Sequence, residues 1–306
     1  MRALLLSSFF IASTASAEVP RVVADIAPIH GLVARVMEGL GEPGLILQPG
    51  ASPHHHAMRP SEARALSQAD LVIWVGHGLT PWLEDPIENL AGDASHLSLA
   101  EVTGSIRLPS RAAGVLGGHD HDHDHGHEDE EGAGVDPHLW LDPDNARLWL
   151  ARIAEALADR DPENANIYRA NAEAGQREIA AAEQAVAAQL GEVTGVPFVV
   201  LHDGFHYFEA HFGIEALAAV KSSEADTPGP ARLSALRETL KESGARCALS
   251  EPQIDDALLR TAVEGMEINF GTIDPLGADI PLGTGHYPAL LKSISAGLSA
   301  CLAPSS

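Results

Sequence analysis

Apolar residues recur along the chain in two alternating patterns. Continuous apolar runs within 70–76 and 197–203 are typical of strands buried on both faces of a parallel sheet. Between such runs lie stretches with apolar residues at helical spacing, as over 29–40, 59–69 and 81–90. This alternation predicts an α/β fold with parallel sheets.

The pattern occurs on both sides of an Ala-, Glu- and Arg-rich region over 143–192. That region predicts two helices, and the second begins near Glu163 and ends near Leu190. At 1.5 Å per residue the second helix is about 40 Å long, enough to span two lobes. We therefore expect two similar βα lobes, an N-terminal one over 18–142 and a C-terminal one over 193–306, joined by one long rigid helix.

The first residues resemble a secretory signal peptide. Arg2 supplies a positive charge, residues 3–12 are mostly apolar, and Ala15-Ser16-Ala17 is a small-residue cleavage site. The apolar run is too short to cross a bilayer. We expect cleavage after Ala17 and a mature protein in the periplasm.

A histidine-rich tract over 117–132 interrupts the apolar pattern. The region 104–134 has almost no large apolar residue after Leu116, so we expect a disordered loop, flexible over 115–134. The chain has a formal net charge of −24, which disfavours nucleic acid and anionic membranes as partners and favours cations. Five histidines of the tract are candidate auxiliary metal ligands: His119, His121, His123, His125 and His127.

The two cysteines, Cys247 and Cys301, form a candidate disulfide, because exported proteins retain such bonds. A cysteine metal site is the alternative. It is the weaker hypothesis because the pair lacks Cys-x-x-Cys spacing.

Four other residues suggest a metal site at the ends of strands. His202 ends a predicted strand, Asp274 follows another, His54 lies in a loop after the short run 45–48, and His138 follows the histidine-rich tract. Ligands of open α/β sheets bind at the carboxyl ends of strands, and imidazole and carboxylate are zinc ligands. Each histidine alone is as readily a surface or capping residue, so spacing leaves the site open. Neighbouring acids such as Asp142 and Asp203 are candidates to orient the rings.

Four motifs resemble those of the ZnuA-like zinc-binding proteins of bacterial ABC transporters. They follow the family's order over almost the whole mature chain: GASPHHHAMRPS (50–61), VDPHLWLDP (135–143), LHDGFHYFE (201–209) and IDPLG (273–277). The resemblance implies two lobes with Zn²⁺ in the cleft between them. It assigns ligand roles to His54, His138 and His202, and matches Asp274 to the fourth ligand of some relatives. The histidine-rich acidic loop and the late cysteine pair are also family features.

Two departures from the family motifs affect the site. His54 is followed by His55 and His56, so the register of the first ligand rests on the spacing to Arg59. Pro53 stands where some relatives carry a glutamate that reaches the metal, which favours Asp274 or water as fourth ligand. Three imidazoles favour Zn²⁺ over Mn²⁺, which prefers more oxygen.

The expected function is capture of Zn²⁺ and its delivery to the inner-membrane permease of an ABC importer, without enzymatic activity. Periplasmic metallochaperones are further candidate partners, and we expect a monomer. Zinc affinity is expected to fall below about pH 6.5, where imidazole becomes protonated. Alternatives are transport of Mn²⁺ or Fe²⁺, a stand-alone zinc buffer, and a zinc hydrolase with Asp274 or Glu209 as general base.

Overall fold

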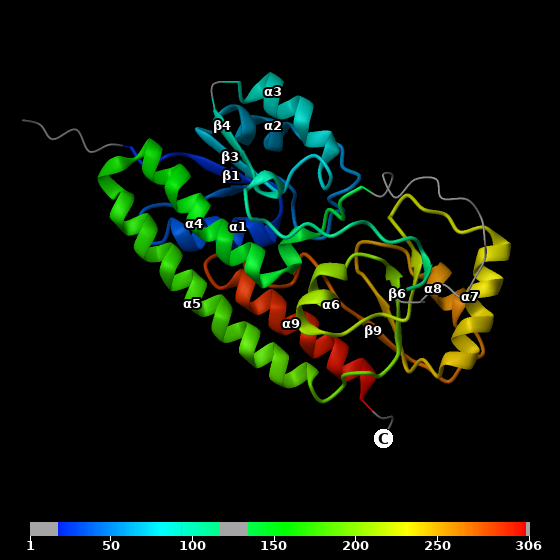
Figure 1. Ribbon diagram of the computed structural model, residues 1–306. Coiled ribbons are helices and arrows are strands. Elements are labelled where there is room, and N and C mark those ends of the chain that lie inside the picture. The colour runs from blue at the N-terminus through cyan, green and yellow to red at the C-terminus, as the bar shows by residue number, and fades with distance from the viewer. Residues whose placement is uncertain (1–17, 93, 117–133, 304–306) are drawn as a thin grey trace, which may run out of the picture.

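The computed structural model describes residues 18–92, 94–116 and 134–303, which form two α/β lobes (Figure 1). The first lobe contains four parallel strands in the order β2-β1-β3-β4. Their bounds are Val22–Ala24 (β1), Gly44–Leu45 (β2), Leu71–Trp74 (β3) and Ser95–Ser98 (β4). Its helices are α1 (Ala27–Val36), α2 (Pro60–Ser67) and α3 (Glu84–Leu90).

The central strands β1 and β3 of the first sheet are covered on both of the faces to which their successive side chains alternately point. Leu71 and Ile73 of β3 belong to the same apolar cluster as side chains of α1. Val72 and Trp74 pack on the other face with side chains of α2 and α3. This two-sided burial explains the continuous apolar run of β3.

The second lobe contains a five-stranded sheet in the order β5-β7-β6-β8-β9. Its strands are β5 (Gly114–Val115), β6 (Phe198–His202), β7 (Ala218–Lys221), β8 (Cys247–Ser250) and β9 (Asn269–Thr272), and β5 alone among these is antiparallel to its neighbour. Apolar side chains of α7 (Pro230–Ser243) and α8 (Ala257–Ala262) pack on one face. Side chains of α6 (His206–Phe212) and α9 (His286–Leu302) belong to the cluster on the other.

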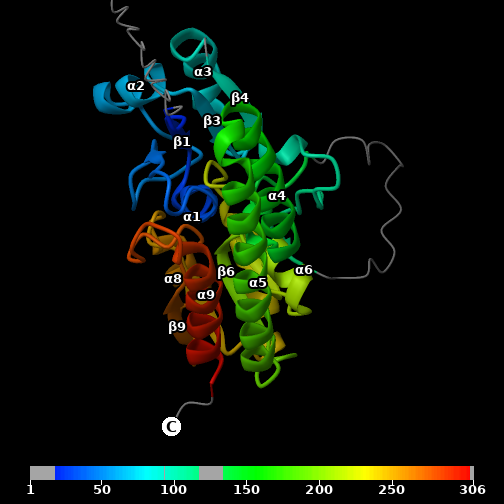
Figure 2. The same cartoon turned by 90° about the vertical axis from the view of Figure 1, so that its left-hand side faces the viewer.

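Two long helices, α4 (Pro143–Arg160) and α5 (Ala165–Leu190), run along both lobes (Figure 2). The 26 residues of α5 pack against α4, against α1 of the first lobe and against α9 of the second. One cluster of buried apolar side chains continues from the first sheet through these helices to the second. The lobes therefore cannot separate widely without exposing apolar surface. The predicted fold of two βα lobes joined by a long helix is confirmed.

The prediction of a disordered loop over 104–134 was wrong for the first part of that range. Gly114 and Val115 pair with Ala219 and Ala218, so this segment adds a strand to the second sheet. Polar contacts hold the segment before it: Tyr207 Oη, for example, accepts from Leu108 N at 2.8 Å. Polar contacts between residues far apart in the sequence cannot be predicted from the pattern of apolar residues along the chain. The rest of the expected loop, with the five tract histidines, lies outside the described residues, as does the expected signal peptide.

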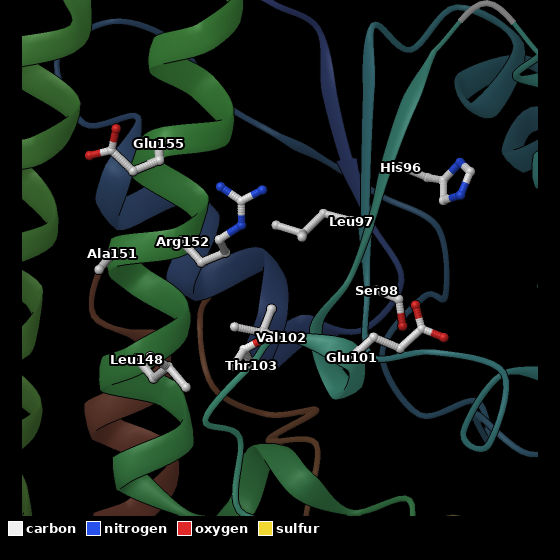
Figure 3. Close-up of a pocket in the computed structure, with 10 residues that line it drawn as sticks. All are labelled: His96, Leu97, Ser98, Glu101, Val102, Thr103, Leu148, Ala151, Arg152 and Glu155. Carbon is white, nitrogen blue, oxygen red and sulfur yellow. The ribbon is translucent and has the colours of Figure 1, made fainter.

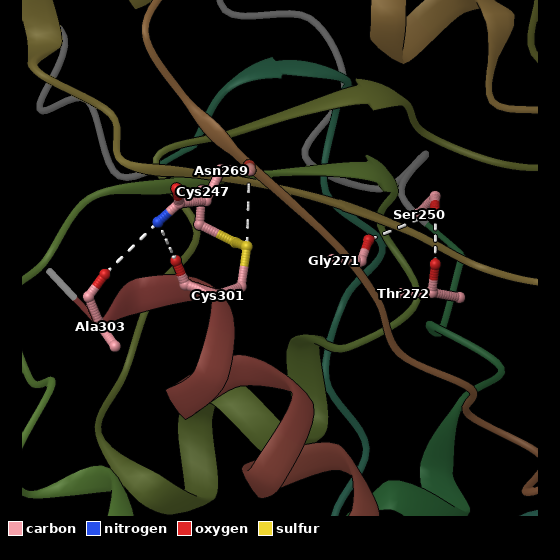
Figure 4. The surroundings of a disulfide bond; sticks show 7 residues. All are labelled: Cys247, Ser250, Asn269, Gly271, Thr272, Cys301 and Ala303. Atoms are coloured by element: carbon pink, nitrogen blue, oxygen red, sulfur yellow. Dashed lines mark hydrogen bonds between the residues drawn. A yellow bond between two sulfur atoms is a disulfide. The ribbon is translucent and has the colours of Figure 1, made fainter. Parts of the chain in front are cut away.

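The structure contains the expected disulfide, which joins Cys247 at the start of β8 to Cys301 near the end of α9 (Figure 4). Both cysteines are buried. Asn269 of the adjacent strand β9 donates from Nδ2 to the carbonyl oxygen of Cys301 at 2.8 Å. The disulfide therefore fixes the last helix to β8, the strand next to the edge strand β9 of the second sheet.

Replacing both Cys247 and Cys301 by alanine is expected to lower the free energy of unfolding. The disulfide closes a sequence separation of 54 residues, and chain entropy alone gives a contribution of about 4 kcal/mol for such a loop. Chemical denaturation of the metal-free protein and of the double variant measures this difference. An unchanged midpoint and slope would contradict the expectation.

Candidate metal centre

The structure brings His54, His138 and His202 together between the lobes. His202 is the last residue of β6, and His138 immediately precedes the short 3₁₀ helix Leu139–Leu141 that leads into α4. His54 lies in the loop between β2 and α2. Each ring therefore comes from a different part of the chain, and the first lobe and the second both contribute.

The spacing of the three rings suits a tetrahedral metal ion. The Nε2 atoms of His54 and His138 lie 3.2 Å apart, and one nitrogen from each ring lies within 4.8 Å of the other two. Two ligands of a tetrahedral Zn²⁺, each about 2.0–2.1 Å from it, are about 3.3 Å apart. The rings line a cavity of about 10 Å³, roughly the space that one water-sized sphere needs.

Two buried carboxylates lie against the far nitrogens of the rings. Asp136 Oδ1 accepts from His138 N at 3.0 Å and lies 2.7 Å from His138 Nδ1. Glu251 Oε1 lies 3.3 Å from His202 Nδ1. The contact with Asp136 holds the proton on Nδ1 of His138 and leaves its Nε2 free for a metal.

The acids expected to orient the rings have other contacts in the structure. Asp142 caps α4 by accepting from Asp144 N at 2.7 Å, and Asp203 is paired with Arg111. Sequence reasoning missed Glu251, which follows the end of β8. Because β8 is parallel to β6, the carboxyl ends of both strands lie at one edge of the sheet, and this signal could have found it.

Burial and neighbouring charges set the protonation of the rings. Burial, together with the nearby rings of His138 and His202, lowers the pKa of His54 to about 2. Burial also disfavours a charged His202, but the carboxylates of Glu251, Glu224 and Asp136 together raise the His202 pKa above its usual value. Burial by itself raises the pKa of Asp136, yet the ring and amide of His138 hold it well below its usual range. His54 is therefore neutral and Asp136 ionised at neutral pH.

The three consecutive histidines have different surroundings. His56 Nε2 lies 2.8 Å from Glu62 Oε2, and its ring lies 4.9 Å from that of Trp82. His55 is exposed. The Glu62 carboxylate also accepts from Arg59 N at 2.7 Å at the start of α2, which fixes the loop. His54 is thus the member of the triplet that faces His138 and His202.

Asp274 lies outside the group of three imidazole nitrogens. Its Oδ1 accepts from Gln253 Nε2 at 2.7 Å and from Leu276 N at 2.9 Å, and its Oδ2 accepts from Ala278 N at 2.6 Å. The adjacent Pro275 and Leu276 line the cavity. The carboxylate therefore shapes this wall through backbone hydrogen bonds, and its role as a ligand stays a prediction.

The rings of His202 and His138 leave little room for a side chain at position 204, which is glycine. A Cβ atom there would lie 3.0 Å from Nδ1 of His202 and 3.5 Å from Nε2 of His138. On another wall, Trp140 donates from Nε1 to the carbonyl oxygen of Pro275 at 2.8 Å. The rings are thus packed tightly enough to hold their positions.

A second group, Asp142, Asp144 and His211, also has metal-ligand spacing. Its electrostatics differ: hydrogen bonds to Asp142 and Glu183 raise the pKa of His211. Arg147 forms ion pairs with both Asp144 and Glu183. A protonated imidazole has no lone pair for a metal, so the charges of this group are already balanced by protein groups.

A wider hollow of about 600 Å³ lies between β4 and α4 (Figure 3). In that view His96 points away from the helix and Glu155 points away from the strand. Its titratable side chains therefore do not converge on a common point, and we assign no metal to it.

Zinc affinity is expected to fall as the pH drops through the pKa of His202. The metal binds neutral imidazole, so a proton on this ring competes with it, at a cost of up to about tenfold in affinity per pH unit. Burial opposes protonation, but Glu251 raises the His202 pKa, so the fall should begin above the ordinary value of about 6.5. His54, with a pKa of about 2, does not contribute.

Competition titrations against a chelator from about pH 8 to pH 5.5 measure this profile. The variant Glu251→Gln should move the fall to lower pH, because it removes the charge that favours the protonated ring. A constant affinity over the whole range would contradict the expectation.

The fold and the site together define a two-lobed α/β protein that presents three imidazoles between its lobes. Residues 22–301 match the family described as ZnuA, zinc-uptake complex component A, periplasmic, and the chain belongs to this family. The expectation drawn from the four motifs is therefore confirmed at the level of the family.

Individual relatives agree along almost the whole chain. The high-affinity zinc uptake system protein ZnuA of Paracoccus denitrificans (strain Pd 1222) is 42% identical, over 94% of this chain and 93% of that protein. The protein of the same name from Brucella abortus (strain 2308) is 35% identical, over 99% and 98%. The periplasmic zinc-binding protein TroA from Treponema pallidum has the same fold, with a TM-score of 0.78 at 21% identity, over 93% of this chain and 99% of that one.

The family consists of periplasmic binding components of zinc uptake systems, not of enzymes. No helix among the described residues is long and apolar enough to span a membrane.

Proposed function

We propose that this protein binds Zn²⁺ with high affinity in the periplasm and delivers it to the inner-membrane permease of an ABC importer. The observation that carries the proposal is the group of His54, His138 and His202, whose nitrogens lie within 4.8 Å of one another. Three imidazoles suit borderline-soft Zn²⁺ better than Mn²⁺, which prefers oxygen ligands. The family and its zinc-uptake relatives support the same metal.

The continuous core supports a binding step with small movements. Because α5 packs against helices of both lobes, we propose that the lobes tilt slightly and the loops at the cleft become ordered, without wide hinge closure. The protein acts as a monomer, with its signal peptide cleaved after Ala17. Metallochaperones of the periplasm are further candidate partners for loading the site.

A zinc hydrolase is the less supported alternative. Such an enzyme needs a general base beside an open metal position. Of the two candidates from the sequence, Asp274 accepts three hydrogen bonds. Glu209 is buried and paired with Arg111 at 2.9 Å. Neither carboxylate is free to act on a water at the three rings.

Growth under zinc limitation tests the transport role. A strain that lacks the gene should grow poorly and take up little zinc, and the wild-type protein should restore both. The variant His138→Ala should not, although it is exported. Wild-type growth and zinc uptake in the deletion strain would argue for a zinc buffer and against import.

We propose an accessory role for the histidine-rich tract: it gathers zinc, senses its abundance, or passes it toward His138. Ordering a chain segment around a tetrahedral ion costs conformational entropy, so we expect zinc sites formed by the tract to be weak. Deleting residues 118–131 should therefore leave one tight zinc site and remove only weaker binding. Isothermal titration measures both classes of site. Loss of the tight site would place it in the tract.

A further inference from the structure

A carboxylate of the second lobe reaches the cavity of the three histidines from the loop between β7 and α7. Glu224 lines this cavity together with His54, His138 and His202. Its Oε2 accepts a hydrogen bond of 2.5 Å from Ser52 Oγ, in the loop of the first lobe that carries His54. Ser52 Oγ also accepts from His54 N at 3.2 Å. Glu224 is thus linked across the cleft to the backbone of a proposed ligand.

The backbone around Glu224 is held in place, whereas its carboxylate is not. Lys221 Nζ donates to the carbonyl oxygen of Glu224 at 2.5 Å. Asp226 accepts from Ser222 N at 3.0 Å and forms an ion pair with Arg232. Within the described ranges, the salt bridges include none to the Glu224 carboxylate, whose hydrogen bond is to the neutral hydroxyl of Ser52. The side chain can therefore turn without breaking an ion pair.

The other carboxylates at the site are engaged. Asp136 and Glu251 face the far nitrogens of His138 and His202. The two oxygens of Asp274 accept three hydrogen bonds, and two of these bonds come from backbone amides. Glu224 remains as the carboxylate that lines the cavity and is held by a single hydroxyl. Three neutral imidazoles leave the charge of a divalent cation uncompensated by a direct ligand, which favours an anionic fourth ligand.

We infer that Glu224 completes the zinc site: it leaves Ser52 and binds the metal at the position that the three imidazoles leave open. The side chain has to turn, because its oxygens lie outside the group of three nitrogens. In the structure, the hydrogen bond to Ser52 keeps the carboxylate beside the cavity. This inference rests on the proposed function and names a ligand and a step of metal capture at that same site.

Zinc titration of the full chain carrying Glu224→Gln tests the inference. Affinity at the tight site should fall about tenfold or more, at least as much as for loss of a group that only supports a ligand. The matched control is Glu242→Gln on α7, which removes the same charge from an exposed position and should leave the affinity unchanged. A zinc-bound structure should place a Glu224 oxygen about 2.0–2.2 Å from the metal.

Two further variants separate the possible failures. If Asp274→Asn lowers the affinity and Glu224→Gln does not, the inference is overturned and the three-histidine site stands. An oxygen of water or of Asp274 in the fourth position of the zinc-bound structure would overturn it too. If His202→Ala leaves the tight site intact, the proposed function itself fails.

Discussion

Replacing His202 by alanine is expected to lower zinc affinity at the tight site by at least about 100-fold. Loss of a residue that merely supports a ligand costs about 10- to 100-fold, and His202 supplies one of the three imidazoles that surround the cavity. Competition with a chelator of known affinity measures the change. Weak binding by the histidine-rich tract should persist.

His96→Ala is the matched control for this prediction. It removes the same side chain from an exposed position on β4, and the affinity of the tight site should not change. One tight site that survives both His54→Ala and His202→Ala would refute the site between the lobes.

Replacing Arg111 by methionine is expected to lower the free energy of unfolding by about 3–5 kcal/mol, the usual cost of removing one partner of a buried ion pair. Arg111 pairs with Asp203 and Glu209, and both carboxylates have side chains only 2% exposed. Without the guanidinium, two acids remain buried with no cation. Thermal or chemical denaturation of the metal-free protein measures the loss.

The pH dependence distinguishes this electrostatic cost from lost packing. Unpaired buried carboxylates bind protons more readily in the folded state than in the unfolded state. Stability of the variant relative to wild type should therefore recover as the pH falls. Arg169→Met is the control, since its pair with Glu155 is about half exposed and should contribute less than about 1 kcal/mol. Equal losses in the two variants would contradict this account.

Much of the fold could be predicted from the apolar pattern. Strands buried on both faces, such as β3 and β6, produce continuous apolar runs, and α5 follows from a long helical stretch after Asp161 and Pro162. The strand β4 was missed because its residues are only partly buried. β5 was missed because two residues in a Gly-rich segment carry no periodicity, and the partner strand supplies their order.

The residues of the candidate site, like the elements of the fold, could be predicted only in part. His54, His138 and His202 lie in motifs whose spacing reflects the turns that hold them. These three residues could therefore be predicted from the sequence as one set of ligands. Glu224 and Glu251 carry no such motif. Glu251 could have been inferred from its place at the end of a strand parallel to β6. The closeness of Glu224 to the rings depends on how the loop after β7 packs, so only the three-dimensional structure relates it to the cavity.

The central claim is that zinc binds among the three imidazoles between the lobes. Anomalous diffraction at the zinc edge, from crystals of the protein with one equivalent of Zn²⁺, tests it most directly. We predict one strong peak about 2.0–2.1 Å from a ring nitrogen of each of His54, His138 and His202. A peak at Asp142, Asp144 and His211 with none among the three rings would contradict the account.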